Sequence, residues 1–435
     1  MKTARQTAFE ILNRINKDNS YSNLVLDSFL DKSELSPADK AFTSALVYGV
    51  TERMLTLDFE LSRYLKQPLK KLKPQVLTIL RLGAYQILFM DKVPASAAIN
   101  ESVKLTKANG VSFASGLVNA VLRKTSSAGL TETDDLSVKY SAPLWLCNLW
   151  KNNYGDENAE KLLESTFGSV ESAVRVNTLK TTADELISLL LFEGFSAEKS
   201  DLIDNCLIVN GNGALHKTEA YAKGLFHVQD TASQLCCSAL NVDENDVVFD
   251  ICAAPGGKSF TLAELMNNNG TIVSMDIYQH RLDLIDSGAA RLGINNIKTK
   301  VNDGSSYNKD LTLADKILCD VPCAGLGVIR KKPEIRYKDF AEVDKLPDLQ
   351  YSILCASTQY LKVGGTLIYS TCSLNKDENE FVIEKFLSEH NNFESVKVLP
   401  ELRRYGDDTD YISLMPHIHN CDGFFIAGIR KIKEV

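Results

Sequence analysis

Residues Asp250–Ser259 read DICAAPGGKS and directly follow the apolar stretch VVF at 247–249. β-Branched and aromatic residues favour a strand, and a glycine-rich turn after a strand commonly opens a helix. Such a turn lets the backbone approach a ligand closely and presents the N–H groups of the helix N-terminus. The stretch therefore predicts a strand, a ligand-binding loop and a helix of an α/β domain.

Strand and helix patterns alternate along the rest of the chain after Gly224. Further strands are expected at GTIVSMD (270–276), IKTKVND (297–303), DKILCD (315–320) and GTLIYS (365–370). This alternation predicts a doubly wound, Rossmann-like parallel sheet over residues 225–435, in which ligands bind at the carboxyl ends of the strands. The last apolar stretch, 423–433, precedes no helix, and we expect it to pair at an edge of the sheet.

The first 130 residues lack the alternating pattern of strands. Apolar residues recur at helical spacing in PQVLTILRLGAYQILFM (74–90) and SAAINESVKLTK (96–107), and proline or glycine separates the segments. We expect an all-α bundle over residues 1–130 and a polar linker within 125–135. Residues 141–224 mix helical and strand patterns, which predicts a small α+β unit.

Composition restricts the class of protein. The chain has 435 residues, 44% hydrophobic and 24% charged, as in globular proteins with real cores. Residues 1–130 carry 18 Lys and Arg against 11 Asp and Glu, although the whole chain has a net charge of −8, which indicates that this part contacts a polyanion. Ten cysteines without a C-x-x-C pair favour reduced thiols over disulfides or zinc. Without a signal peptide or a run of the roughly 18 apolar residues that a membrane helix needs, we expect a cytoplasmic protein.

Two familiar nucleotide motifs do not fit the loop. A P-loop needs a glycine where Cys252 stands, and Pro255 removes one N–H group from a phosphate cradle. The dinucleotide fingerprint G-x-G-x-x-G is absent. A nucleoside-type cofactor remains, with Asp276 after the second strand suited to ribose hydroxyls and Asp303 after the third suited to an adenine amino group. Each Asp alone is also a common helix cap, but their succession favours S-adenosylmethionine.

Two thiols are expected at the same edge of the sheet. Cys323 lies in DVPCAG after the fourth strand, and Cys372 lies in STCS after the fifth. Two cysteines at adjacent strand ends favour thiolate attack on an electron-poor ring. A lone cysteine in a core is usually a small hydrophobic residue, which we expect of Cys236, Cys237, Cys319 and Cys355.

The motifs DICAAPGGKS, DVPCAG and YSTCS, in this order, resemble the RNA 5-methylcytosine methyltransferases of the NOL/NOP/Sun group. The N-terminal helical segments resemble the NusB-type RNA-binding domain, and the combination is similar to bacterial enzymes that methylate a cytosine of 16S rRNA. The resemblance covers nearly the whole chain. It implies a NusB-like helical bundle (1–130), a small α+β middle unit (141–224), an S-adenosylmethionine-dependent methyltransferase domain (225–435) and 16S rRNA as partner. Nothing in the sequence calls for a metal, a membrane or more than a monomer.

The resemblance also implies roles for individual residues. Cys372 matches the family nucleophile and Cys323 the second cysteine, which is expected to assist release of the product. Asp320 is expected to bind the hydrogen-bonding edge of the cytosine. S-adenosylmethionine is expected to be bound by Cys252, Ala253, Ala254, Pro255, Gly256, Gly257, Lys258, Asp276, Asp303 and Asp320.

Basic residues in two regions are candidates for contacts with the RNA backbone, although each also suits a solvated surface or a helix end. They are Arg330, Lys331, Lys332 and Arg336, which follow the Cys323 loop, and Arg5, Arg53, Arg81, Arg123 and Lys124, which lie in the N-terminal part. Three other functions stay open: a cytosine methyltransferase that acts on tRNA or DNA, a non-catalytic RNA-binding assembly or antitermination factor, and a P-loop hydrolase. The two thiols argue against a pure binding protein, and Cys252 argues against the P-loop hydrolase.

Overall fold

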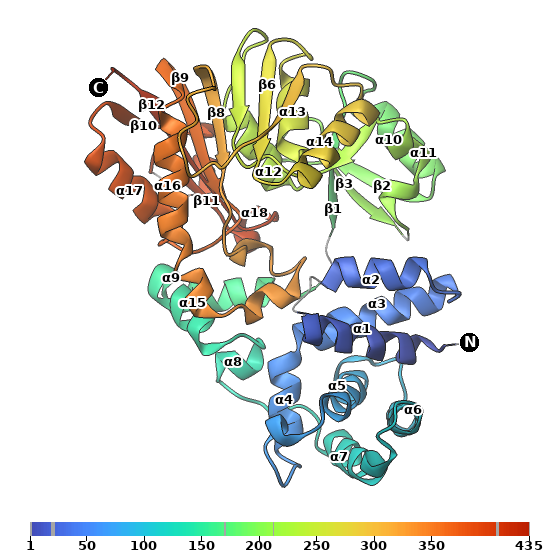
Figure 1. Ribbon diagram of the computed structural model, residues 1–435. Coiled ribbons are helices and arrows are strands. Elements are labelled where there is room, and N and C mark those ends of the chain that lie inside the picture. The colour runs from blue at the N-terminus through green and yellow to red at the C-terminus, as the bar shows by residue number, and fades with distance from the viewer. Residues whose placement is uncertain (1, 19–21, 169–170, 212, 406–408, 435) are drawn as a thin grey trace. The chain divides into compact units, whose positions relative to one another are not determined.

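The computed structural model describes residues 2–18, 22–168, 171–211, 213–405 and 409–434. Contacts divide the chain into two units (Figure 1): unit 1 comprises Met1–Phe167 with Ile329–Lys338, and unit 2 comprises Gly168–Val328 with Asp339–Val435. The segment 329–338 thus packs within unit 1, although unit 2 contains the sequence on both sides of it. The domain boundaries 1–130, 141–224 and 225–435 stay a prediction.

Unit 1 is helical, as the sequence predicts. Pro37 and Pro74 begin two of its helices, and Ser36 caps the first of these by accepting a hydrogen bond from the Asp39 N–H. None of the described helices combines the length and apolar character needed to cross a membrane. The helices are α1 (Ala4–Asp18), α2 (Ser22–Asp31), α3 (Pro37–Glu52), α4 (Met54–Ser62), α5 (Pro74–Phe89), α6 (Ala95–Ala108), α7 (Ser115–Ala128), α8 (Leu136–Lys139) and α9 (Leu144–Ser165), with the short 3₁₀ turns η1 (Leu69–Lys71), η2 (Ser112–Ala114) and η5 (Pro333–Tyr337).

Unit 2 begins with a small antiparallel sheet of order β2-β3-β1-β4. Its buried residue Arg175 forms an ion pair of 2.7 Å with Glu264 on helix α13 (Gly257–Leu265), which joins this sheet to the larger one. The four strands are β1 (Ser172–Val176), β2 (Phe195–Lys199), β3 (Cys206–Gly211) and β4 (Phe226–Val228), accompanied by α10 (Ala183–Phe192), η3 (Leu215–Lys217) and α11 (Glu219–Ala222).

The larger sheet has the order β10-β12-β9-β8-β5-β6-β7, with β11 paired to β12. Strands β5 to β9 pair in parallel, and β10, β11 and β12 pair antiparallel. The strands are β5 (Val247–Asp250), β6 (Thr271–Asp276), β7 (Ile297–Val301), β8 (Ala314–Asp320), β9 (Leu361–Thr371), β10 (Phe393–Val396), β11 (Ile412–Leu414) and β12 (Phe424–Lys431).

The predicted edge position of 423–433 is wrong. Strand β12 lies inside the sheet, because it pairs with β9 on one side and with β10 on the other. Nearly every residue of β12 is buried, as expected for a strand covered on both faces. The edge strand next to β12 is β10, which has only four residues and carries little sequence signal; the opposite edge strand is β7.

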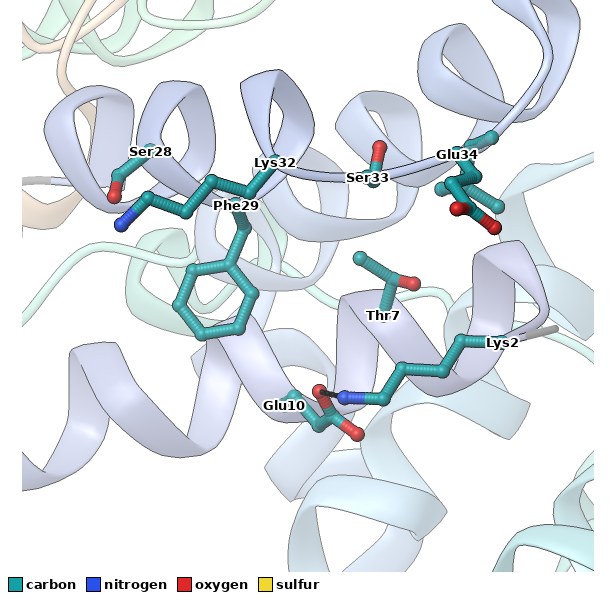
Figure 2. Close-up of a pocket in the computed structure, with 9 residues that line it drawn as sticks. Lys2, Thr7, Glu10, Ser28, Phe29, Lys32, Ser33 and Glu34 are labelled. Carbon is teal, nitrogen blue, oxygen red and sulfur yellow. Dashed lines mark hydrogen bonds and ion pairs between the residues drawn. The ribbon is translucent and has the colours of Figure 1, made fainter.

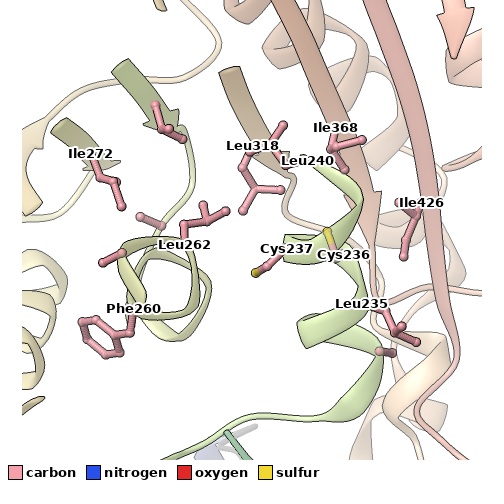
Figure 3. Packing of buried hydrophobic residues seen from close by; sticks show 14 of the residues in the cluster. Leu235, Cys236, Cys237, Leu240, Phe260, Leu262, Ile272, Leu318, Ile368 and Ile426 are labelled. Atoms are coloured by element: carbon pink, nitrogen blue, oxygen red, sulfur yellow. The ribbon is translucent and has the colours of Figure 1, made fainter. Parts of the chain in front are cut away.

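Helices cover both faces of this sheet, so the predicted doubly wound fold is confirmed. Successive residues of β8 face opposite cores: Leu318 packs with α12 and α13, whereas Ile317 and Cys319 pack with the other face. Figure 3 shows Cys236 and Cys237 of α12 in the first of these cores. The helices are α12 (Thr231–Ala239), α13, α14 (Gln279–Leu292), α15 (Phe340–Val343), α16 (Leu346–Thr358), α17 (Glu380–Glu389) and α18 (Pro416–His419), with η4 (Leu326–Val328) and η6 (Pro400–Tyr405).

Strand β5 marks the place where the order of the strands reverses. Its neighbours are β6, which follows it in the chain, and β8, which begins a second run toward β9. Ligands of such sheets bind beyond the carboxyl ends of the strands at this switch point. A ligand site is therefore expected at the loops that follow β5, β8 and β9.

Candidate active site

The loop 252–258 joins β5 to α13 at the switch point. Gly256 has a φ of 107°, and an added Cβ there would lie 2.6 Å from the ring of Phe260, so both conformation and space require glycine. At Gly257 the nearest atoms to an added Cβ belong to the Gln229 side chain at 3.9 Å, which leaves its backbone open to a ligand. The Ala253 N–H donates to the Met275 carbonyl at 2.8 Å and fixes the loop against β6.

Lys258, in the first turn of α13, forms an ion pair with Asp320 at the end of β8, with an Nζ–Oδ2 distance of 2.7 Å. The other carboxylate oxygen of Asp320 accepts a hydrogen bond from the Ser370 hydroxyl of β9 at 2.8 Å. Burial is the largest single effect and would lower the pKa of Lys258, but the charge and hydrogen bond of Asp320, together with Cys236 and Cys237, raise that pKa overall. A fixed ammonium group therefore lies beside the carboxylate predicted to bind the substrate.

The two predicted active-site thiols lie next to each other. The Sγ atoms of Cys323 and Cys372 are 3.2 Å apart, and both side chains are half-buried. The hydrogen bond between the two thiols lowers the pKa of Cys372, whereas the same hydrogen bond and burial raise the pKa of Cys323 well above its ordinary value. Of the two thiols, Cys372 is therefore the more acidic.

The backbone keeps these two segments together. The Gly327 N–H, four residues after Cys323, donates to the Cys372 carbonyl at 2.9 Å, and the Gly423 N–H donates to the Gly327 carbonyl at 2.9 Å. An added Cβ on Gly327 would lie 1.9 Å from the Gly423 carbonyl oxygen, so the two chains approach as closely as glycine allows.

Two predicted cofactor carboxylates follow β6 and β7. Asp276 is buried, pairs with Arg281 at 2.8 Å and accepts a hydrogen bond from the Tyr278 N–H. Asp303 is exposed and accepts hydrogen bonds from the Ser305 N–H and hydroxyl, which lower its pKa. Neither caps a helix, since α14 has no side-chain cap and Asp303 caps only a turn. Asp276 thus ends β6, and Asp303 lies two residues beyond the end of the neighbouring strand β7.

Asp250, the last residue of β5, offers a pH test of the site. It is fully buried, Ser259 donates to its Oδ2 at 2.6 Å, and among the described residues its Oδ1 has no partner. Burial raises its pKa from 3.8 to about 7, against the opposing effects of the Ser259 hydrogen bond and Lys258. Its contribution to stability is therefore complete below about pH 4 and is lost as the pH rises to about 7.

We expect Asp250→Asn to escape this loss. The free energy of unfolding of the variant, relative to the wild type, should increase between about pH 4 and pH 7. Urea unfolding followed by circular dichroism across this range measures the difference, with the exposed Asp243→Asn as the control. If the difference in unfolding free energy between Asp250→Asn and the wild type is independent of pH, the raised pKa of Asp250 is contradicted.

Two buried polar residues that the sequence analysis does not identify lie beside the thiol segments. Gln350 of α16 donates through Nε2 to the Pro322 carbonyl at 2.9 Å and to Glu378 at 3.0 Å. Gln350 ends the stretch KLPDLQ (345–350), and Glu378 lies in the stretch KDENE (376–380). Both stretches are polar, so hydropathy does not predict that these two side chains are buried.

The prediction that Arg336 binds RNA is wrong. Arg336 is 1% exposed and donates to the carbonyls of Glu52, Tyr140 and Thr166, all within unit 1. Its guanidinium also lies over the ring of Phe167. The neighbouring residues Arg330, Lys331 and Lys332 are half-buried.

The predicted N-terminal cations divide into two groups. Arg53 stacks on the rings of Phe89 and Phe167, Arg81 pairs with Asp58 at 2.6 Å, and Arg5 donates to Gln86, so these three make internal contacts. The exposed cations among the five are Arg123 and Lys124.

A cavity of about 490 Å³ in unit 1 contains none of the predicted site residues (Figure 2). It lies between α1 and the C-terminal end of α2 with the residues that follow it, and Phe29 and Lys32 are among its lining residues. Lys2 and Glu10 pair within it at 2.7 Å. Because no cysteine and none of the predicted site residues line it, this cavity is not the candidate active site.

Comparison with known proteins agrees with this geometry. Residues 2–127 match the NusB family, residues 142–216 match a ferredoxin-like domain of RsmF/B-like methyltransferases, and residues 237–430 match the family described as 16S rRNA methyltransferase RsmB/F. The probable ribosomal RNA small subunit methyltransferase B of Bacillus subtilis is 36% identical over 99% of each chain. The chain belongs to the ribosomal RNA small subunit methyltransferase B family. This membership confirms the resemblance inferred from the motifs.

A further relative and a solved structure agree with this assignment. Ribosomal RNA small subunit methyltransferase B of Proteus mirabilis is 29% identical, and the match covers 92% of each chain. The crystal structure of PH0851 superposes with a TM-score of 0.86 at 27% identity and covers 98% of each chain. The predicted fold class, a NusB-like helical part, a small middle domain and an α/β methyltransferase domain, is therefore confirmed.

Proposed function

We propose that this chain transfers a methyl group from S-adenosylmethionine to C5 of a cytosine in 16S rRNA, through a covalent bond between Cys372 and C6 of the base. The observation that carries the proposal is the pair of thiols, Cys323 and Cys372, with 3.2 Å between their sulfur atoms beyond strands β8 and β9. Family membership supports methyl transfer to rRNA. A cytoplasmic, monomeric enzyme is part of the proposal.

The residues around the switch point fit S-adenosylmethionine. The glycine turn after β5 leaves the Gly257 backbone open, and it offers helix N–H groups without the full phosphate cradle of a P-loop. We propose that loop residues 252–258 and Asp320 bind the methionine part, that Asp276 binds ribose hydroxyls and that Asp303 binds the adenine. When bound, S-adenosylmethionine supplies an electrophilic methyl group.

The two thiols and the Asp320 carboxylate act at different steps of the proposed reaction on the cytosine. The C5 atom of cytosine is a poor nucleophile, so the Cys372 thiolate adds to C6 and makes C5 electron-rich. Asp320, held by Lys258 and Ser370, binds the N3/N4 edge of the cytosine, where negative charge develops during this addition, and in its protonated form it donates to N3 and takes up that charge. After methylation, Cys372 is bonded to C6 and no longer shares a hydrogen bond with Cys323. Cys323, as a thiolate or through a water molecule, then takes up the C5 proton, the C5–C6 double bond forms again and Cys372 leaves as a thiolate.

The decisive experiment follows methyl groups with a tritium label. S-adenosylmethionine labelled in the methyl group is incubated with the protein and with unmodified 16S rRNA or tRNA, and the nucleosides are separated after digestion. Label in 5-methylcytidine from 16S rRNA supports the proposal. Label in tRNA alone would keep the chemistry and replace the substrate, label at another atom would contradict the C6 adduct, and no label in any RNA would favour a binding protein.

RNA binding through unit 1 should depend on Arg123 and Lys124, because these candidates are exposed. Replacing both with Ala should weaken RNA binding and make the slope of log K against log salt concentration shallower by roughly 0.7–0.9 per lost phosphate contact. Filter binding at several salt concentrations measures both quantities. Lys2→Ala, which removes a cation paired with Glu10, is the control, and an unchanged slope in the double variant would contradict the assignment.

A further inference from the structure

One buried carboxylate connects the two segments that carry the thiols. Glu378 is fully buried. Its Oε2 atom accepts a hydrogen bond from the Ala324 N–H at 2.7 Å, and its Oε1 atom accepts one from the Ser373 hydroxyl at 2.6 Å. Ala324 directly follows Cys323, and Ser373 directly follows Cys372. A single side chain thus binds the residue after each thiol, one with each of its oxygen atoms.

The same carboxylate binds two further segments. Gln350 of α16 donates to Oε2 at 3.0 Å while it also donates to the Pro322 carbonyl, and the Asn375 amide donates to Oε1 at 3.3 Å. The Tyr369 hydroxyl holds the Glu378 backbone carbonyl at 2.6 Å. These donors are all neutral, so the cost of burying the charge is offset by several hydrogen bonds at once. The position of Glu378 is therefore fixed from four parts of the chain.

We propose that Glu378 is a positioning residue that sets the distance between the sulfur atoms of Cys323 and Cys372. The proposal deepens the proposed function and rests on it for the effect on catalysis. A sulfur–sulfur hydrogen bond of 3.2 Å is lost when either loop moves by about an ångström, and such a shift is enough to impair an aligned reaction. The charge of Glu378 also raises the pKa of Cys323, in addition to the larger effects of its hydrogen bond with Cys372 and of burial.

The test compares Glu378→Gln and Glu378→Asp with the wild type. Gln has one acceptor oxygen in place of two, so one of the two loops is released. We expect kcat for methyl transfer to fall roughly 10- to 100-fold in Glu378→Gln, with KM for RNA and the affinity for S-adenosylmethionine unchanged. Glu378→Asp keeps both oxygen atoms and should recover part of the loss.

Alkylation of Cys372 gives a second readout that needs no RNA. Iodoacetamide modification of this residue, followed by mass spectrometry over a series of pH values, reports its thiolate fraction. If Glu378 positions the thiols, Glu378→Gln weakens the hydrogen bond from Cys323 and moves the profile to higher pH. If Glu378 acts only through its charge, removing that charge moves the profile to lower pH, which would overturn the proposal.

Glu60→Gln is the matched control, because Glu60 is also buried and accepts hydrogen bonds from the Thr131 N–H and hydroxyl within unit 1. It should lower stability without moving the alkylation profile of Cys372. A profile and a kcat in Glu378→Gln equal to those of Glu60→Gln would also overturn the proposal. If the wild type methylates no RNA while the profile still moves to higher pH, the proposed function fails and the positioning role stands.

Discussion

Replacing Cys372 with Ala should lower methyl transfer to RNA by roughly 10⁴-fold or more, because the variant has no nucleophile to activate the cytosine ring. The side chain lies in a half-buried position at the end of β9, so the substitution removes one sulfur atom and leaves the surrounding hydrogen bonds of the turn in place. Binding of S-adenosylmethionine should be unchanged. Transfer of labelled methyl groups and equilibrium binding of the cofactor measure the two quantities.

The companion variant Cys323→Ala should behave differently. It keeps the nucleophile but loses the group proposed to assist release, so a covalent complex of protein and RNA should accumulate in the presence of S-adenosylmethionine. A denaturing gel detects this complex. Cys355→Ala, at a half-buried cysteine on α16, is the control for loss of a thiol. Equal activity of Cys372→Ala and Cys355→Ala would refute the proposed mechanism.

Replacing Arg336 with Met should destabilise unit 1 by about 3–5 kcal/mol, because three buried carbonyls lose their donor. This is a large fraction of the 5–15 kcal/mol by which a typical domain is stable. Burial lowers the pKa of Arg336, yet a guanidinium remains charged at all ordinary pH values, so Arg336 keeps its hydrogen bonds throughout this range.

Tryptophan fluorescence measures this effect selectively. The two tryptophans of the chain, Trp145 and Trp150, both lie on α9 in unit 1. Their urea unfolding transition should move to lower concentration in Arg336→Met. Arg330→Met, at a half-buried position of the same segment, is the control, and equal midpoints for the two variants would contradict the structural role of Arg336.

The parts of the fold that sequence predicts best are those with a local cause. Proline and serine mark helix starts in unit 1, and the strands β5, β6 and β8 coincide with apolar stretches that end in Asp. The position of β12 depends instead on its pairing with β9, a strand more than 50 residues earlier in the chain, and no local sequence pattern predicts this pairing. Arg336 was mistaken for a surface residue because a run of basic residues normally indicates solvent, whereas its partners lie 170 to 284 positions away.

The candidate site shows the same division. The two cysteines and the glycine loop carry recognisable motifs, and their placement at the carboxyl ends of parallel strands follows from the fold class. Glu378 lies in the polar stretch NKDENE, which reads as a surface turn, and its burial depends on donors that come from Ala324 and Gln350. The residues that hold a site together are thus harder to predict than those that carry its chemistry.

The assignment of residues 329–338 to unit 1 has a consequence for synthesis of the protein. Domains generally fold as units as the chain leaves the ribosome, beginning at the N-terminus. Unit 1 obtains Arg336 and Tyr337, which bind the carbonyls of Thr51, Glu52 and Ser141, only after more than half of unit 2 has been translated. Most of unit 1 is therefore synthesised first, but its packing is completed only when residues 329–338 have also been synthesised.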